Sequence, residues 1–320
     1  MDLSSRPTRL LLIAAVARRY YLDGRSKVEI ADELGLSRFK VARLLDLARA
    51  TGLVRIEVAD IGAINAELST RLRAASGLQH AVVVNTSDES PATLQHEVGK
   101  AAAQLLAEIV TADDVLGLAW SRSVSAMTNT LTRLPAIPVV QLTGALVRPD
   151  VTDTSVDLVR HAAGVSGGAG YFFYAPTIVP DTATARALHK QPEIARAFGR
   201  FSSVTTAVVG VGLWAPGEST VYDATKHKAR RELDRLGVRG EVAGILVDSD
   251  GRPVESDLTR RMIGISAAQL RATPQVVALA YGTARSPAVH AAIRGGLIKS
   301  IVTHASLATA LLSEPFSVAT

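Results

Sequence analysis

The stretch VLGLAWSRSVSAM (residues 115–127) reads as a short apolar strand, a polar turn at Ser121, Arg122 and Ser123, and a helix. Apolar runs of the same kind recur along the chain: QHAVVV (79–84), VVQLTGAL (139–146), TAVVGVG (206–212), EVAGILVD (241–248), QVVALAYG (275–282) and IKSIVTH (298–304). Helical patterns separate most of them, at 91–110, 123–133, 153–163, 226–236, 286–294 and 305–312. Continuous apolar strands that alternate with helices are typical of a mostly parallel sheet covered on both faces. Residues 78–320 are therefore predicted to form a Rossmann-like α/β domain.

The turn at Ser121, Arg122 and Ser123 is a candidate anion site. Backbone N–H groups at a helix N-terminus bind phosphate, and hydroxyls and a guanidinium strengthen such a site. An ordinary strand-to-helix turn with a capping serine explains the same residues equally well. The ligands of open α/β sheets bind beyond the carboxyl ends of the strands, where the loops at Gly144 and Gly210 are also expected.

The beginning of the chain has a different pattern, SKVEIADELGLSRFKVARLL (residues 26–45). It predicts two helices, 27–34 and 38–50, which follow a first helix at 8–22 and are separated by a turn at Gly35. Ala31 is small enough for the helices to cross closely, and Val41, Leu44 and Leu45 form an inward face. The run LVRIEV (53–58) would add a strand as a small wing. The spacing predicts a winged-helix-like helix-turn-helix head.

The outward face of the third helix is basic and is predicted to bind duplex DNA. It carries Ser37, Arg38, Phe39, Lys40 and Arg43. The first residues of a recognition helix reach base edges in the major groove, and Arg38 could bond a guanine or a phosphate. Phe39 could touch a thymine methyl, although packing between helices or over a sugar is the more ordinary role. The alternative is a helical hairpin whose basic residues are only solvated.

Composition and charge agree with this division. Hydrophobic residues make up 48% and charged residues 20%, so the chain can bury a large core, and it has no cysteine for a disulfide or a thiolate metal site. Residues 1–60 hold 11 Lys+Arg against 8 Asp+Glu, which accounts for three of the formal net charge of +5. We expect a DNA-binding domain at 1–60, a helical linker at 61–77, and a domain at 78–320 that binds an effector or a substrate.

Two other function classes compete with a DNA-binding regulator. A sugar-phosphate isomerase with an accessory helical head would need a general base, for which Asp248, Glu241 and His304 are the candidates near strand ends. A membrane-attached sensor would depend only on LLLIAAVA (10–17), which is better explained as an amphipathic helix. The histidines are scattered, without HExxH spacing, and no cofactor or metal site is expected.

The chain resembles the SorC-type sugar-binding transcriptional regulators, a family that includes the Bacillus deoxyribonucleoside and central glycolytic regulators. The resemblance extends over nearly the whole chain, through IADELGLSRFKVARLLDLARATGLVRIEV (30–58), LGLAWSRSV (116–124), VQLTGAL (140–146), GEVAGILVDSDG (240–251) and ALAYGTARSPAVHAAIRGG (278–296). It implies a cytoplasmic homodimer or homotetramer, with residues 78–320 as an effector-binding and oligomerisation domain similar to sugar-phosphate isomerases. A phosphorylated sugar would bind that body and release the DNA.

The resemblance also implies site residues. The family's phosphate loop corresponds to Ser121, Arg122 and Ser123, and the Gly144 loop and the Asp248 region correspond to walls of the sugar pocket. The family's Gly-Gly-x-x-Lys corresponds to Tyr281 through Arg285, with Gly282 kept. Arg285 keeps a positive charge for an anion but cannot form a Schiff base, and Tyr281 is expected to narrow the pocket.

Overall fold

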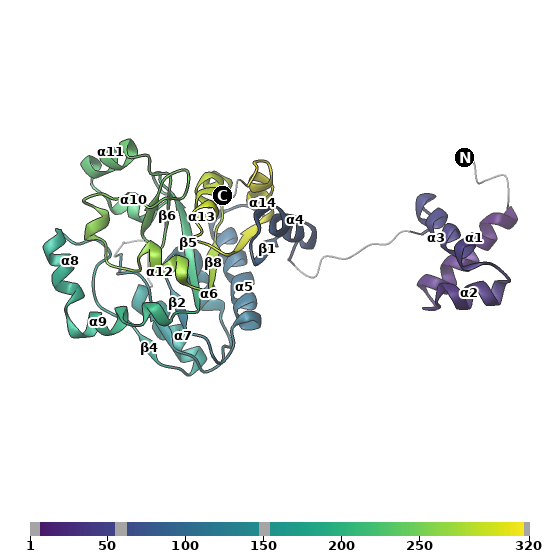
Figure 1. The fold of residues 1–320 in the computed structure, drawn as a ribbon, viewed down its shortest axis with the longest axis horizontal. Helices are drawn as coiled ribbons and strands as arrows, with labels where there is room; N and C mark the ends of the chain where they lie inside the picture. Colours follow the sequence, from purple (N-terminus) through teal and green to yellow (C-terminus); the bar gives the residue numbers. More distant parts are fainter. Residues whose placement is uncertain (1–6, 55–62, 147–153, 317–320) are drawn as a thin grey trace. The chain divides into compact units, whose positions relative to one another are not determined.

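A computed structural model describes residues 7–54, 63–146 and 154–316 of the chain (Figure 1). Its contacts divide the chain into two compact units, residues 1–59 and 60–320. The predicted wing strand at 53–58 lies outside the described residues from residue 55 onward.

The first unit contains three helices, α1 (Pro7–Tyr21), α2 (Lys27–Leu34) and α3 (Arg38–Ala50). Ser26 and Glu29 form a reciprocal capping box at the start of α2, and Gly35 ends it in the left-handed conformation (φ 61°), which a glycine adopts without strain. The buried side chains of all three helices meet in one core. The helix boundaries agree with those predicted, to within one residue.

The second unit is an α/β domain. Its helices are α4 (Ala66–Ser76), α5 (Pro91–Ile109), α6 (Arg122–Thr130), α7 (Ser155–Ser166), α8 (Thr182–His189), α9 (Pro192–Phe198), α10 (Thr220–Ala224), α11 (His227–Arg235), α12 (Ala267–Ala272), α13 (Ser286–Arg294) and α14 (Ala305–Leu312), with 3₁₀ turns η1 (Phe201–Ser203), η2 (Thr259–Arg261) and η3 (Thr283–Arg285). Its strands are β1 (His80–Val84), β2 (Leu116–Leu118), β3 (Val139–Gln141), β4 (Gly170–Tyr171), β5 (Thr206–Leu213), β6 (Gly240–Val242), β7 (Ile245–Val247), β8 (Gln275–Leu279) and β9 (Ser300–His304).

The sheet is mostly parallel, as predicted. Seven strands are parallel to their neighbours in the order β1-β9-β8-β5-β2-β3-β4. After β2 the chain adds β3 and β4 on one side, and then returns to place β5 on the other side of β2. The boundary between β2 and β5 is therefore a topological switch point, where open α/β sheets form a crevice.

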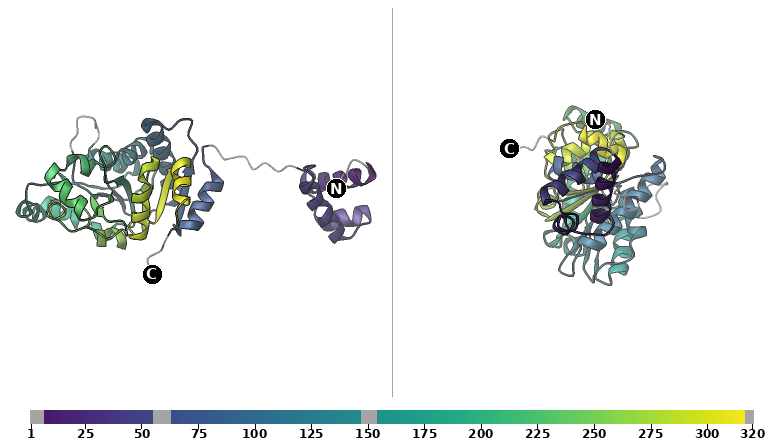
Figure 2. Two further views of the ribbon diagram at one scale, coloured as in Figure 1. Left: turned by 90° about the horizontal axis from the view of Figure 1, so that it is seen from above. Right: turned by 90° about the vertical axis from the view of Figure 1, so that its right-hand side faces the viewer.

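Helices cover both faces of the sheet (Figures 1 and 2). Along β5, the side chains of Ala207 and Val209 join the core under α13 and α14, whereas Val208 joins the core under α5, α6 and α7. Neighbouring side chains of a strand point to opposite faces, so a strand buried on both faces is apolar at every position. This explains why the strands read as continuous apolar runs.

Two predicted elements differ in the structure. The run EVAGILVD was expected to be one strand, but it forms the antiparallel hairpin β6–β7, because Ala243 (φ 51°) and Gly244 (φ 82°) make a tight turn inside it. The expected linker helix is α4, and its Leu72 is fully buried in the core of the body. Since α4 also packs on β1 and α14, it belongs to the second unit.

Candidate functional site

A small pocket opens at the carboxyl ends of β2, β5 and β8, at the switch point of the sheet. Its volume is about 50 Å³, and its lining includes Ser121, Arg122, Ser123, Glu218 and Arg285. A second cavity of about 20 Å³ adjoins it, with Trp120, Thr220 and Glu241 lining both. Residues from distant parts of the chain thus meet where a ligand of this fold is expected.

The turn before α6 forms one wall of the pocket. Ser121 is the N-cap of α6, and its hydroxyl accepts a hydrogen bond from the Val124 N–H at 3.1 Å. Gly210 of β5 faces this serine so closely that a Cβ at residue 210 would lie 2.6 Å from the Ser121 Cβ. Because Ser121, Arg122 and Ser123 line the pocket, the N-terminus of α6, which carries the positive end of the helix dipole, lies at this wall.

Arg285 forms the opposite wall and is only 8% exposed. Its Nη2 lies 2.8 Å from Oε2 of Glu218, and its guanidinium lies over the Tyr281 ring at 4.4 Å from the ring centre. The same guanidinium donates a hydrogen bond to the Tyr281 carbonyl oxygen. Tyr281 is itself held by Gln95, whose Nε2 donates to the phenolic oxygen at 2.9 Å. Tyr281 lines the pocket, at the position where it was expected to narrow the site.

Glu241 lies in the pocket, although the sequence suggested it only as a base for the enzyme alternative. Its Oε2 accepts from the Ser219 hydroxyl at 3.0 Å and its Oε1 from the Gly244 N–H at 2.8 Å. Burial raises the pKa of the Glu241 carboxyl, and these two hydrogen bonds and Arg285 oppose that shift. A carboxyl group held this way can accept hydrogen bonds from the hydroxyls of a sugar.

The remaining predicted effector residues lie in different places. Gly144 lines the adjoining cavity, where a Cβ would lie 2.7 Å from the Pro176 carbonyl oxygen. Gly282 lies between Tyr281 and the 3₁₀ turn that carries Arg285. Asp248 does not line the pocket: its Oδ1 accepts from the Asp250 and Arg252 N–H groups, both at 2.9 Å, and so caps its own turn. The expectation that Asp248 contributes to the wall is not supported by this geometry.

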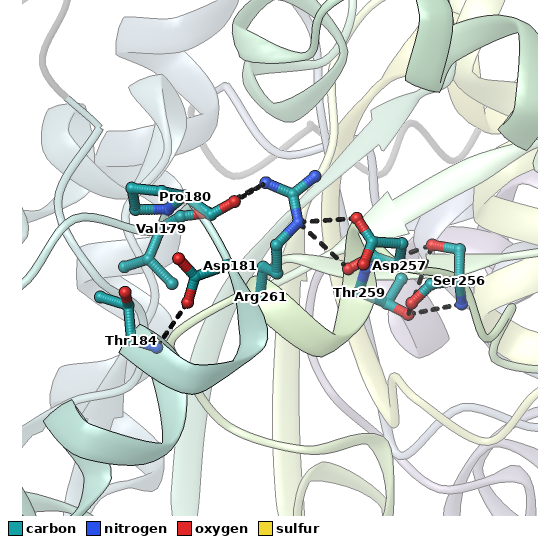
Figure 3. A network of polar contacts seen from close by, with 8 residues as sticks. All are labelled: Val179, Pro180, Asp181, Thr184, Ser256, Asp257, Thr259 and Arg261. Atoms are coloured by element: carbon teal, nitrogen blue, oxygen red, sulfur yellow. Dashed lines mark hydrogen bonds and ion pairs between the residues drawn. The ribbon is translucent and has the colours of Figure 1, made fainter.

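Arg261 is the centre of a network of polar contacts (Figure 3), and its chain neighbours Arg260 and Met262 line a cavity of about 310 Å³. Nη1 of Arg261 donates to the carbonyl oxygens of Val179 and Pro180 at 3.0 and 3.1 Å, and its Nε to Oδ2 of Asp257 at 3.0 Å. Asp181 beside it caps α8, and the hydrogen bond from the Thr184 N–H lowers the pKa of that carboxyl. The network joins the chain before α8 to η2.

His304, the third candidate base of the enzyme alternative, has a structural role. His304 is 1% exposed, and its Nε2 accepts from the Gly282 N–H at 3.0 Å, which positions the turn that carries Arg285. Residues 164–168 (GVSGG) match the G-x-S-x-G spacing of serine hydrolases. However, Ser166 ends α7 and donates to the Ile137 carbonyl oxygen. Within residues 7–54, 63–146 and 154–316, no group of three acidic or histidine side chains is arranged to hold a metal ion.

His304 makes stability dependent on acid pH. Burial lowers the pKa of His304, and Glu89 partly opposes this shift. Below about pH 6.5 the unfolded chain therefore binds a proton at this histidine that the folded protein does not bind. As the pH decreases below that value, the free energy of unfolding should therefore decrease, by up to about 1.4 kcal/mol per pH unit for this group. The decrease should end once the pH is below the pKa of His304 in the folded protein.

Urea denaturation between pH 7 and 5 measures this slope. His304→Gln keeps an acceptor for the Gly282 N–H and removes the titration, so it should reduce the slope. His189 and His290, whose pKa values burial also lowers, would leave a residual slope. The exposed His227→Gln serves as the control. Equal slopes for His304→Gln and the wild type would contradict the assignment.

The first unit presents a basic surface on α3. Ser37, Arg38, Phe39, Lys40 and Arg43 are all exposed, while Val41, Leu44 and Leu45 on the opposite side are buried. Ser37 caps the helix by accepting from the Lys40 N–H at 3.2 Å. Phe39 is 80% exposed, so the expectation that it packs between the helices is wrong.

No helix of the described residues has the length and apolarity to cross a bilayer.

Comparison with known proteins identifies the family. The family model described as "Putative sugar-binding domain" matches residues 63–313. The transcriptional regulator YjhU of Escherichia coli K12 is 28% identical over 305 residues, which cover 92% of each chain. The transcriptional regulator LsrR of Klebsiella pneumoniae is 27% identical over 309 residues, covering 94% of this chain and 93% of its own.

A solved structure supports the same fold. The full-length sorbitol operon regulator SorC from Klebsiella pneumoniae superimposes with a TM-score of 0.72 at 21% identity, covering 96% of this chain and 100% of SorC. YjhU and LsrR are named transcriptional regulators, which favours the regulator over the enzyme alternative. The match over residues 63–313 and the regulators that resemble the whole chain show that this protein belongs to the sugar-binding family of SorC-type transcriptional regulators.

Proposed function

We propose that the protein binds operator DNA through its first unit and that a phosphorylated sugar in the pocket of the second unit modulates this binding. The observation that carries the proposal is the meeting of Arg122, Arg285 and the N-terminus of α6 in one pocket. A phosphate group has the charge and the acceptor oxygens that such a set of donors recognises.

In this proposal the first unit is a helix-turn-helix head. Support comes from the close packing of α2 and α3 around Ala31, from the turn at Gly35, and from the exposed basic face of α3. Arg38, Lys40 and Arg43 would contact phosphates and base edges of the major groove, with Ser37 and Phe39 beside them. Such a head acts on DNA in the cytoplasm.

The sugar would lie between the phosphate site and the adjoining cavity. Arg122, Ser121 and Ser123 would bind the phosphate together with Arg285, and Glu241 would accept hydrogen bonds from sugar hydroxyls. Gly144 would let the ligand approach the backbone closely, and Gly282 would position the turn of Arg285. This proposed binding mode includes no cofactor and no metal.

Regulation would follow from linkage. An effector changes operator affinity only as far as it prefers one quaternary arrangement and the DNA prefers another. A homodimer or homotetramer would present two heads to a pseudo-palindromic operator, with a half-site spacing set by its symmetry.

A thermal-shift screen of the wild-type protein tests the ligand class. We expect at least one phosphorylated pentose or hexose to raise the unfolding temperature, because a ligand that binds only the folded state stabilises it. The same sugar without its phosphate should produce a much smaller shift at equal concentration. A set of sugars whose phosphorylated and free forms act alike would contradict the proposal.

A further inference from the structure

The pocket already contains an anion for Arg285, the carboxylate of Glu218. Oε2 of this residue lies 2.8 Å from Nη2 of Arg285, and the Glu218 carbonyl oxygen accepts from the same nitrogen at 3.5 Å. The two residues are 67 positions apart in the chain. A phosphate that engages Arg285 therefore competes with a side chain of the protein itself.

The two partners of this ion pair differ in their freedom to move. The Arg285 side chain is 9% exposed, and it is held by the Tyr281 ring and carbonyl oxygen. The Glu218 side chain is 34% exposed and lies on the segment between β5 and α10. When the pair separates, Glu218 can swing into solvent and recover its hydration, whereas Arg285 stays in the pocket.

The second carboxylate of the pocket has a different setting. Glu241 is held by the Ser219 hydroxyl and the Gly244 N–H, both independent of Arg285. Among the described residues, the lining of the pocket includes two arginines, Arg122 and Arg285, and two carboxylates, Glu218 and Glu241. Displacing Glu218 is the change that gives the pocket a surplus of positive charge for an incoming anion.

We propose that Glu218 is an internal competitor for Arg285 that keeps inorganic phosphate alone from occupying the site. Every anion that binds Arg285 must first separate this ion pair, which lowers the affinity for the phosphate group by a constant factor. The hydroxyls of a phosphorylated sugar make further contacts that offset this loss of affinity, whereas inorganic phosphate makes no such contacts. Glu218 therefore makes the response depend on the sugar as well as on the phosphate. This inference rests on the proposed function.

Glu218→Gln tests the proposal in the full-length protein. The amide keeps the size of the side chain and an acceptor for Arg285 but removes the competing charge. We expect inorganic phosphate to bind this variant about tenfold more tightly than the wild type, or better, as measured by calorimetry at fixed ionic strength. The affinity for a dephosphorylated sugar should not change, because such a ligand does not displace Glu218.

Two controls accompany the variant. Glu108→Gln changes the net charge equally at an exposed position on α5 and should leave phosphate binding unaltered. The double variant Glu218→Gln with Arg285→Gln should not show the tighter binding of inorganic phosphate, because the guanidinium that the first substitution frees is then absent. Glu218→Ala, with its unfolding temperature measured without phosphate, shows whether the gain depends on charge or on a repacked pocket.

The outcomes separate this inference from the proposed function. If the wild type prefers phosphorylated sugars but Glu218→Gln binds inorganic phosphate no more tightly than the wild type, the competitor role is overturned and the proposed function stands. If the wild type shows no preference for a phosphorylated sugar over its free form, both are overturned. Tighter phosphate binding that survives the loss of Arg285 would also overturn the competitor role.

Discussion

Arg38→Glu combined with Arg43→Glu is expected to weaken operator binding by at least about 100-fold, because each reversal replaces an attraction to the duplex by a repulsion. Both arginines lie on the exposed face of α3. Val41 and Leu44 on the same helix are buried and pack in the core of the first unit. The substitutions therefore alter the charge of the surface without removing a buried contact.

The measurement uses DNA fragments that the wild-type protein enriches from a random duplex pool, with binding titrated at several salt concentrations. The double variant should also show a smaller salt dependence, since it neutralises fewer phosphates. Arg186→Glu with Arg196→Glu, two exposed reversals on α8 and α9, is the matched control. Equal operator affinity for the wild type and the α3 variant would rule out α3 as the recognition helix.

Arg122→Ala should weaken the binding of a phosphorylated sugar by about 10- to 100-fold, the effect of losing one charge-assisted contact to a phosphate. The free sugar should bind the variant as it binds the wild type, because in the proposed binding mode its hydroxyls would interact with the part of the pocket around Glu241. The comparison therefore isolates the contribution of the phosphate.

Titration calorimetry with the best ligand from the thermal-shift screen, and with its dephosphorylated form, measures both affinities. Arg133→Ala, an exposed arginine three residues after α6, controls for the change in net charge. If the affinity for both ligands decreases equally, Arg122 does not bind the phosphate and has a structural role.

Much of the fold could be predicted because its signals are local. The helices α2 and α3 begin at capping serines, Ser26 and Ser37, and these were recognisable from spacing alone. The buried strands were recognisable because both of their faces are apolar. The hairpin β6–β7 was missed because Ala243 adopts a positive φ, which is uncommon for a residue with a Cβ.

The candidate site was only partly predictable. Ser121, Arg122 and Ser123 follow one another at the start of α6, so the strand-to-helix pattern locates them. Asp248 and Glu241 occur in the same apolar run, and the pattern predicted Asp248 as the effector residue, whereas Glu241 lines the pocket and Asp248 caps its own turn, because a tight turn divides the run.

Sequence alone was sufficient for the division into a basic helical head and a parallel α/β body, because helix caps, turn glycines and apolar periodicity act over a few neighbouring residues. The three-dimensional arrangement was needed to show that Glu218 neutralises Arg285 and that Glu241 lies beside them. Such pairings depend on which strands become neighbours in the sheet, and the order of β2, β5 and β8 follows from the packing of the whole domain.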